Sequence, residues 1–302
     1  MSASSRGAAH LHAASAAYVV LSHQHPEQVL RLTRTLRRGS PESTIVLHHD
    51  DRRTRVDEAA LRALNVTRVL PPSPVSWGGP TQLDAFLRGL QTALRADFDW
   101  LTVLSGQDYP LRPLAEIERG WRESGVDGFV ESVPVEPPPW TRAGADEFAR
   151  RYFYRYRQVR PPGRALRRVV AAARPLLALR EMPWGTLLGV RHRGPGVPVR
   201  RGGDWLTLSR RAVEVVTGGA LVDHYRRTIL PTESLPHTAL HAAGLPLSGD
   251  TRRYTAWAPG AAHPAMLGSG DLDAILASGA DFARKFAPED PVLDELDRVV
   301  FA

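Results

Sequence analysis

Cysteine is absent from the 302 residues of this sequence, so neither a disulfide nor a thiolate metal site can form. Long apolar runs are also missing: the run from Ala13 to Leu21 is well short of the roughly 20 residues that a membrane span needs. The same run is too short for the apolar core of a signal peptide. We therefore expect a soluble, cytoplasmic protein without stable membrane insertion, with a disordered tail over residues 1–16.

The charged residues are unbalanced in sign and in type. The sequence has 39 Lys and Arg against 32 Asp and Glu, which is a formal net charge of +7, and nearly all of the cations are arginine. The planar guanidinium group suits phosphate, so this composition favours a nucleotide, a nucleic acid or an acidic surface as partner. With 43% hydrophobic residues, the chain from residue 17 to residue 302 can form one large domain.

Short β-branched runs alternate with amphipathic stretches in the first part of the chain. We expect strands at residues 17–21, 44–47, 66–70 and 101–104, and helices at residues 26–38, 58–64 and 81–94, the last capped by Thr81. This alternation indicates an α/β fold with a Rossmann-like, doubly wound, mostly parallel sheet, whose nucleotide-binding part is residues 17–133.

A polar turn, SGQDYP at residues 105–110, follows the strand expected at residues 101–104. In an open α/β sheet the ligand crevice forms beyond the carboxyl ends of the strands, which makes this turn a candidate for the site. An ordinary corner between a strand and a loop explains the local sequence equally well.

Residues 134–203 differ in character from the rest and form a basic insert, which we expect to be helical, with a helix at residues 164–179. The segment ARRYFYRYRQVR, residues 149–160, interleaves arginine with tyrosine. Such a segment can bind nucleic acid through phosphate pairing and base stacking, or can lie on a membrane surface. No recognised nucleic-acid module accompanies it, so we favour a solvated helix face and expect no nucleic-acid partner.

The last third of the chain, residues 204–302, contains a candidate general base. We expect a strand at residues 204–208, a helix capped by Ser209, and another helix capped by Thr232 that runs to Ala243. Glu233 would lie in the first turn of that helix, where backbone amides favour the ionised carboxylate. A fixed, ionised glutamate can act as a general base, although helix capping alone explains the local sequence.

Metal-binding patterns are weak in this sequence. The Asp-x-Asp pairs at residues 97–99 and 271–273 arise easily by chance, and hard cations need several more oxygen ligands. Four histidines, at positions 23, 25, 48 and 49, lie near Asp50, but two strand ends meeting at one edge explain them better than a transition-metal site. We expect structural roles for these residues and no bound metal.

Six segments occur in a recognisable order along the chain. They are residues 17–53, residues 75–94 with WGG at 77–79, LSGQDYPLRP at 104–113, GGDWLTLSRRAV at 202–213, PTESLPHTAL at 231–240 and FARKF at 282–286. Together they resemble the core-2/I-branching family of β-1,6-N-acetylglucosaminyltransferases and related peptide O-xylosyltransferases. The resemblance implies a GT-A fold, a UDP-sugar donor carrying N-acetylglucosamine or xylose, a hydroxyl acceptor, and inversion at the anomeric carbon with no metal or other cofactor.

The same resemblance implies the site residues. Glu233 in PTES matches the catalytic base, and Lys285 in FARKF matches the lysine that clamps the diphosphate in place of a metal. The other donor-binding candidates are Val20, Ser22, His23, Asp50, Trp77, Gly78, Gly79, Arg252, Arg253 and Arg284, and the acceptor-binding candidates are Asp108, Glu131, Trp205 and Trp257. Family members often carry a second cation where this chain has Ala265. Either one of the three arginines supplies that charge, or the diphosphate is held less firmly than in the family.

The implied chemistry is a single displacement, in which a carboxylate takes the proton of the attacking hydroxyl while cations absorb charge from the leaving diphosphate. The motifs nominate no second carboxylate of the kind that a covalent glycosyl-enzyme requires. The competing interpretation is a non-catalytic GT-A-like protein whose basic insert binds glycans, anionic membranes or nucleic acid. In either case we expect residues 134–203 to bind and select the acceptor or partner.

Overall fold

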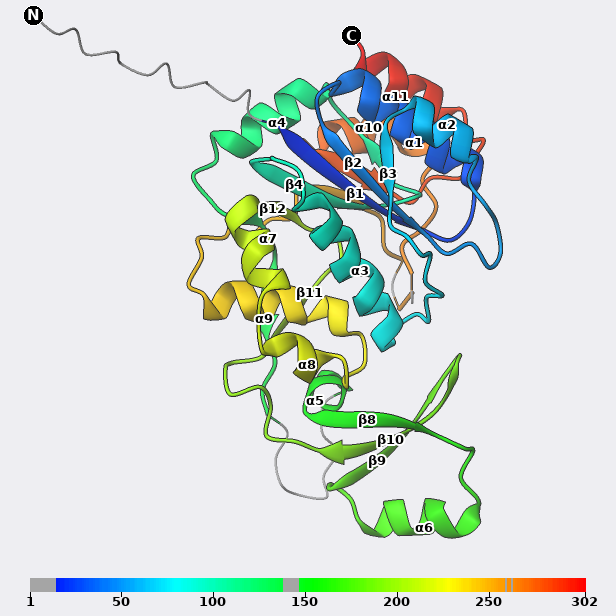
Figure 1. Cartoon of the computed structure of the whole chain (residues 1–302), viewed down its shortest axis with the longest axis vertical. Coiled ribbons are helices and arrows are strands. Elements are labelled where there is room, and N and C mark those ends of the chain that lie inside the picture. Colours follow the sequence, from blue (N-terminus) through cyan, green and yellow to red (C-terminus); the bar gives the residue numbers. More distant parts are fainter. Residues whose placement is uncertain (1–14, 138–146, 259, 262) are drawn as a thin grey trace, which may run out of the picture.

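A six-stranded sheet forms the centre of the protein (Figure 1). The computed structural model describes residues 15–137, 147–258, 260–261 and 263–302, so most of the expected tail and Pro138 and Pro139 lie outside the described residues. The strand order is β3 (Val66–Arg68), β2 (Thr44–His49), β1 (Ala16–Ser22), β4 (Trp100–Ser105), β12 (Thr207–Ser209) and β6 (Gly128–Phe129). The first four strands are mutually parallel, which confirms the expected α/β class with a mostly parallel sheet.

Strand β12 runs antiparallel to β4, and β6 runs antiparallel to β12. The sequence places a strand at residues 204–208, and the structure moves it to Thr207–Ser209. Because β12 is antiparallel to β4, the chain enters it at the edge of the sheet where β4 ends. Asp204 and Trp205, which immediately precede β12, therefore lie at that edge.

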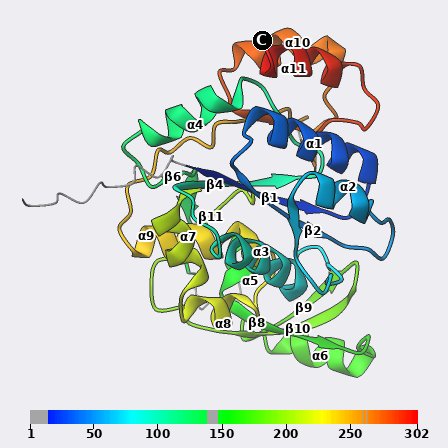
Figure 2. The ribbon, with the colours of Figure 1, turned by 45° about the horizontal axis from the view of Figure 1, so that its top comes forward.

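Helices cover both faces of the sheet, as Figure 2 shows. Alternate residues of β1 enter different cores: Tyr18 and Val20 pack on one face, and Ala17 and Val19 pack on the other. The first face is covered by α1 (Pro26–Gly39), α2 (Glu58–Ala63), α4 (Leu114–Arg122), α10 (Leu272–Ala277) and α11 (Val292–Val300). The second face is covered by α3 (Pro80–Ala93), α7 (Arg210–Thr217) and α9 (Leu235–Ala242), with α8 (Leu221–Tyr225) beside them.

Of the two helix caps that the sequence predicts for α7 and α3, the structure has one. Ser209 caps α7 as expected, because its side chain accepts a hydrogen bond from the amide of Ala212. The cap expected at Thr81 is wrong: α3 begins at Pro80, whose fixed φ and missing amide proton suit the first helical position. The hydroxyl of Thr81 instead accepts a hydrogen bond from the amide of Ser76, which closes the preceding loop at 2.8 Å.

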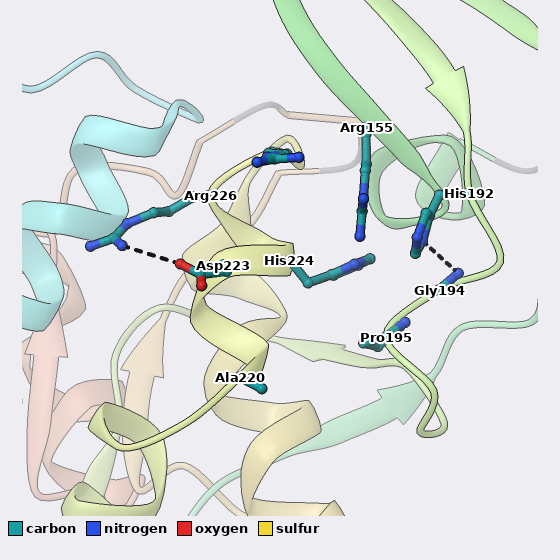
Figure 3. A pocket seen from close by; sticks show the side chains of 9 residues that line it. Arg155, His192, Gly194, Pro195, Ala220, Asp223, His224 and Arg226 are labelled. Carbon is teal, nitrogen blue, oxygen red and sulfur yellow. Dashed lines mark hydrogen bonds and ion pairs between the residues drawn. The ribbon is translucent and has the colours of Figure 1, made fainter.

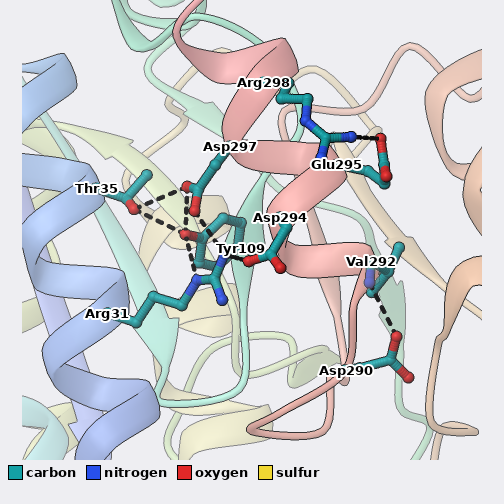
Figure 4. Close-up of polar contacts among 9 residues, drawn as sticks. All are labelled: Arg31, Thr35, Tyr109, Asp290, Val292, Asp294, Glu295, Asp297 and Arg298. Carbon is teal, nitrogen blue, oxygen red and sulfur yellow. Dashed lines mark hydrogen bonds and ion pairs between the residues drawn. The ribbon is translucent and has the colours of Figure 1, made fainter.

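A smaller sheet joins two segments that are far apart in the sequence. Strand β14 (Phe282–Arg284) pairs with both β13 (Arg253–Thr255) and β5 (Tyr109–Pro110), so the FARKF segment lies beside the turn that follows β4. Tyr109 anchors this turn to two helices (Figure 4), because its hydroxyl donates to Asp297 of α11 at 2.6 Å and contacts Thr35 of α1 at 2.8 Å. Arg31 of α1 adds an ion pair to Asp297 at 2.6 Å.

The insert is mainly a sheet, whereas we expected it to be helical. It contains α5 (Glu147–Tyr152), α6 (Arg164–Ala172) and an antiparallel sheet of β8 (Tyr154–Val159), β10 (Gly185–Arg191) and β9 (Leu177–Met182). The helix expected at residues 164–179 ends at Ala172, and the residue before Pro175 is biased toward extended backbone. Two further short strands, β7 (Ser132–Pro134) and β11 (Arg200–Gly202), pair where the insert joins the main sheet.

The arginine and tyrosine stretch is largely a strand and not a solvated helix face. In β8, Tyr154 and Tyr156 are buried while Arg155 and Arg157 are exposed, which is the period of two that a strand produces. None of the helices in the described residues is long and apolar enough to cross a membrane.

Candidate active site

The carboxyl ends of β1, β2 and β4 and the amino end of β12 meet at one edge of the central sheet. Gly106, in the turn after β4, packs so closely against β1 and α1 that a Cβ there would lie 2.9 Å from carbon atoms of both Ser22 and Val29. A glycine is therefore required for this turn to fold back onto the neighbouring strand. The side chains expected at the end of β1 differ in position: Ser22 is half-buried, His23 is exposed, and Val20 is fully buried in the core. Val20 therefore has no side-chain surface for a donor, contrary to expectation.

Asp50, directly after β2, holds the loop that contains WGG. Its carboxylate accepts hydrogen bonds from the amide of Val75 at 2.8 Å and from the guanidinium group of Arg52 at 2.6 Å. Burial alone would raise the pKa of Asp50, but these hydrogen bonds outweigh it and lower the pKa to about 2. The expected contact with uridine stays a prediction, because both carboxylate oxygens of Asp50 already have protein partners.

The WGG loop, residues 77–79, connects the sheet edge to the candidate base. Gly78 has a φ of +73°, and its carbonyl accepts a hydrogen bond from the amide of Leu230 at 2.9 Å. The amide of Gly78 donates to the side chain of Gln82 at 2.6 Å, and the amide of Gly79 donates to the carbonyl of Ser76. This loop is thus held against the turn that contains Glu233.

Trp77 is the exposed member of the loop, with 53% of its surface accessible. Its ring lies edge-on to the imidazole of His263, with 6.3 Å between centroids, and its carbonyl accepts a hydrogen bond from the indole of Trp184 in the insert. An exposed ring at this position could pack against a sugar or a base, since both present flat apolar faces.

Gln82 of α3 bridges the two parts of the candidate site. Its amide nitrogen donates to Asp204 at 3.4 Å and to the hydroxyl of Thr232 at 3.2 Å. Thr232 therefore does not cap α9, as we expected from the sequence. Residues Pro231–Glu233 form a 3-10 turn, and α9 starts after it at Leu235.

Glu233 is enclosed, with 27% of its side chain accessible, and forms an ion pair with Arg151 at 3.2 Å. Burial raises the pKa of Glu233 to about 7, and the nearby carboxyl of Asp204 contributes to the rise, while Arg151 and Arg201 oppose it. This shift is opposite to the one expected from a helix first turn, because loss of water and a second acid outweigh the backbone amides. A carboxyl with a pKa near 7 can accept a proton at neutral pH and is a better base than an ordinary glutamate.

Three charged residues near Glu233, namely Asp204, Arg151 and Arg201, were not among the site residues expected from the sequence, although Asp204 lies in the GGDWLTLSRRAV segment. Burial raises the pKa of Asp204, whose second carboxylate oxygen has no hydrogen-bond partner among the described residues. Arg151 and Arg201 both lie over the ring of Phe148, at 4.9 and 3.5 Å from its centroid. Only the packing of the insert against the main sheet places these two arginines beside the base.

Lys285 is the only lysine in the sequence and follows β14. It is half-buried, and burial together with the neighbouring Arg284 lowers the pKa of its amine. Arg284 lies over the ring of Trp205 at 4.4 Å, and its charge also acts on Asp204. The charge of Arg284 thus acts on both Lys285 and Asp204, and the carboxyl of Asp204 acts on Glu233.

Asp108 lies beneath this cluster and not at its surface. Its fully buried carboxylate pairs with Arg253 and Arg284, each at 3.1 Å. Arg253, whose side chain is 5% accessible, also donates to the hydroxyl of Thr102. Neither Asp108 as an acceptor contact nor Arg253 as a donor contact fits this burial. Asp108 instead holds Arg284 in place, and Arg253 pairs with the same carboxylate.

Arg252 points to a different part of the protein. Its guanidinium group lies 5.2 Å from the ring centroid of Phe129 and 3.7 Å from Asp281, in the core on the first face of the sheet. Arg284 is therefore the only one of the three arginine candidates that the structure places next to Lys285, and the best substitute for the cation missing at Ala265.

The two remaining acceptor candidates are exposed. Glu131 precedes β7, and its carbonyl lies so close to Gly202 that a Cβ there would approach it to 2.3 Å. Trp257 lies in the loop after β13, with 58% of its surface accessible. Nothing in the structure brings an acceptor to either residue, so their roles stay predictions.

The Asp-x-Asp pairs do not belong to this cluster. Asp97 precedes β4, at the opposite edge of the sheet, and is paired with Arg210 at 3.9 Å. Asp271 accepts a hydrogen bond from the amide of Gly268 at 2.9 Å and so caps the start of the 3-10 turn Ser269–Asp271. The described residues contain no group of three or more histidines and carboxylates arranged to hold a metal ion.

Comparisons with known proteins converge on one family. A family model described as Core-2/I-Branching enzyme matches residues 16–276. Two curated relatives from Arabidopsis thaliana, beta-glucuronosyltransferases GlcAT14A and GlcAT14B, are 25% and 24% identical over 299 and 267 residues. These matches cover 85% and 78% of this chain but 58% and 52% of the relatives, so the chain spans about half the length of the curated relatives it matches.

Similarity to solved structures is weak. A CMP:2-keto-3-deoxy-manno-octonic acid synthetase complexed with CTP has a TM-score of 0.33 and 11% identity, over 78% of this chain and 88% of that chain. A likeness at this level carries no argument about fold or function.

Proposed function

Since this chain belongs to the core-2/I-branching enzyme family of glycosyltransferases, we propose that it transfers a sugar from a UDP-sugar to a hydroxyl group with inversion. In this proposal Glu233 is the general base, and the reaction needs no metal ion. Family membership also decides between the two interpretations of the sequence in favour of an enzyme.

The observation that carries the proposal is the environment of Glu233. A carboxyl whose pKa is about 7 is largely protonated or largely ionised depending on small changes in pH, so it exchanges protons readily with a substrate hydroxyl. Its ion pair with Arg151 restricts the rotation of the side chain, so that the base keeps one orientation. Both of these properties favour general-base catalysis.

The proposed step is a single displacement. The acceptor oxygen bonds to the anomeric carbon from the face opposite UDP, its proton passes to the Glu233 carboxylate, and the bond from the anomeric carbon to the diphosphate breaks. The leaving diphosphate keeps the electron pair, and the cations of Lys285 and Arg284 stabilise its charge. Asp204 helps by keeping the pKa of the base high, and it is a positioning residue because no reacting atom touches it in this scheme.

The transferred sugar is the least constrained part of the proposal. The resemblance of the sequence to its family favours N-acetylglucosamine or xylose, whereas both curated relatives are named for transfer of glucuronic acid. We therefore include all three sugars in the proposal. The acceptor is any hydroxyl-bearing glycan, peptide or small metabolite that fits between the insert and the sheet edge.

A donor panel tests the proposal. Purified protein is incubated with UDP-N-acetylglucosamine, UDP-xylose and UDP-glucuronic acid and a mixture of sugar and peptide acceptors, with EDTA or with Mg²⁺. We expect UDP release from one donor that EDTA does not reduce, and a product with inverted anomeric configuration by NMR. Retained configuration would exclude single displacement, and loss of activity in EDTA would exclude the metal-independent mechanism.

The role of Glu233 is tested separately with Glu233→Gln. We expect this variant to lose at least about 99% of its transfer activity, the usual scale for a general base, while binding UDP with unchanged affinity by calorimetry. Glu123→Gln, at the exposed end of α4, is the matched control and should keep full activity. Normal turnover of Glu233→Gln at saturating donor would reject Glu233 as the base.

A further inference from the structure

A second candidate site lies between the insert and helix α8, apart from the cluster around Glu233. A cavity of about 540 Å³ opens between the ends of β8 and β10 and helix α8, and Figure 3 shows it from close by. Its lining includes three arginines and two histidines, Arg155, Arg226, Arg227, His192 and His224, with Asp223 as its single carboxylate. A cavity of this volume is large enough for a ligand of the size of a sugar.

The cavity carries an excess of positive charge. Arg226 already forms ion pairs with Asp84 at 3.2 Å and with Asp223 at 3.5 Å. The charge of Asp223, the carboxylate in the cavity lining, is therefore balanced by Arg226. Arg155 and Arg227 are exposed and form no ion pair within the part of the chain that the structure describes. Two guanidinium groups are therefore left to face an anionic ligand.

His224 is the clearest sign that something binds here. It is 6% accessible, its ring lies 5.3 Å from that of His192, and Figure 3 shows both rings and Arg155 directed toward one another. The backbone of Tyr152 comes near the imidazole but not in hydrogen-bond geometry, so neither ring nitrogen has a partner among the described residues. An unsatisfied buried donor is unfavourable. Neither ring nitrogen is accessible to solvent in this structure, so a ligand oxygen would satisfy the donor only after the imidazole turns toward the cavity.

His192 offers a second donor. Its Nδ1 accepts a hydrogen bond from the amide of Gly194 at 3.1 Å, which leaves the proton of the neutral ring on Nε2. Burial lowers the pKa of both histidines, that of His224 to about 4, so both are neutral at pH 7 and each provides one N–H group. Two N–H donors and two guanidinium groups around one space match the oxygens of a phosphate, sulfate or carboxylate group.

We propose that this cavity binds a small anionic ligand of the size of a monosaccharide, which carries a phosphate, sulfate or carboxylate group. Arg155 and Arg227 bind its charge, and His192 and His224 donate hydrogen bonds to it. The proposal concerns binding at this cavity alone and does not rest on the proposed transfer reaction.

Calorimetry with defined probes tests the proposal. Glucose 6-phosphate, glucuronate, inorganic phosphate and sulfate are titrated into the full-length protein with saturating UDP present, so that a diphosphate site is already filled, and glucose is the neutral control. We expect at least one of the anions to bind and glucose not to bind. Binding of glucose 6-phosphate and glucuronate, but not of phosphate and sulfate, would identify an anionic sugar as the ligand. Binding of phosphate or sulfate, but of neither sugar, would identify a free inorganic ion.

Variants then locate the site. Arg155→Met should weaken binding at least about tenfold, because it removes a charged hydrogen-bond donor, whereas Arg157→Met on the same strand, outside the lining, should have no effect. His224→Phe keeps the ring shape and removes the unsatisfied nitrogens, so it should raise the melting temperature of the free protein and also weaken binding. Failure of all four anions to bind, or equal affinity in Arg155→Met, Arg157→Met and wild type, would overturn the proposal.

Discussion

Replacing Glu233 by glutamine should make the protein more stable while making it inactive. The amide is close in shape to a protonated carboxyl, so the substitution removes the titration of this group with little change in packing. The pKa of Glu233 lies at about 7 in the folded protein, against an ordinary value of 4.5, and one unit corresponds to about 1.4 kcal/mol. The wild-type carboxylate therefore lowers the free energy of unfolding by roughly 3 kcal/mol above pH 7.

The pH dependence follows from the direction of the shift. Because the folded pKa is raised, the folded state binds the proton more tightly than the unfolded state does. The contribution of the group to stability is complete below pH 4.5, falls as the pH rises, and is lost once the pH passes about 7. Glu233→Gln should consequently exceed wild type in unfolding free energy by roughly 3 kcal/mol at pH 8, and by less than about 0.5 kcal/mol at pH 4.5.

Urea unfolding followed by tryptophan fluorescence at pH 4.5 and pH 8 measures this difference. Glu123→Gln, an exposed glutamate at the end of α4, is the control and should match wild type within about 0.5 kcal/mol at both pH values. If Glu233→Gln is no more stable than wild type at pH 8, or if its gain is the same at both pH values, the carboxyl is not held at a raised pKa and our account of the base is wrong.

Three further predictions concern the neighbours of the base and the loop that holds it. Asp204 raises the pKa of Glu233 and Arg151 lowers it, so Asp204→Asn should move the acidic limb of the pH profile of kcat/KM to lower pH and Arg151→Met should move it to higher pH. Each shift should be up to about one pH unit. Profiles identical to wild type would contradict these charge effects on Glu233. Lys285→Met should weaken UDP binding by calorimetry about 10- to 100-fold, with partial recovery in Lys285→Arg, and unchanged affinity would remove this residue from the diphosphate site. Gly78→Ala should cost about 1 kcal/mol of unfolding free energy from backbone strain, because φ is +73° and the terminal methyl of Met182, 2.9 Å from the added Cβ, can move aside. Gly196→Ala, at φ +86° with no atom within 4 Å, should lose about the same amount, and a much larger loss in Gly78→Ala would show that its neighbours cannot give way.

Lys285 also offers a direct measurement, because it is the only lysine of the chain. Reductive methylation with ¹³C-formaldehyde labels this amine and the α-amino group alone, so the NMR titration of Lys285 can be followed without assignment of other lysines. Its pKa is lowered by burial and by Arg284 in the free protein, and bound diphosphate should raise it.

Local patterns in the sequence were sufficient for the parallel part of the fold. Runs of four or five mostly apolar residues placed β1, β2 and β4, and the helical spacing of Leu30, Leu36 and their neighbours placed α1. The family could also be inferred from ordered motifs, and the match to residues 16–276 confirms it. The insert was harder, because its alternation of arginine and tyrosine fits either a helix with mixed faces or a strand, and only the pairing of β8 with β10 decides.

The sequence by itself therefore determined the class of fold, the family and the motifs that contain Glu233 and Lys285, since these depend on the order of residues along the chain. The tertiary structure decided which charges lie together: it set Asp204, Arg151 and Arg201 around the base, enclosed Asp108 and Arg253, and turned Arg252 away. A pKa depends on burial and on charges that are distant in sequence but near in space, so no local pattern could report that of Glu233.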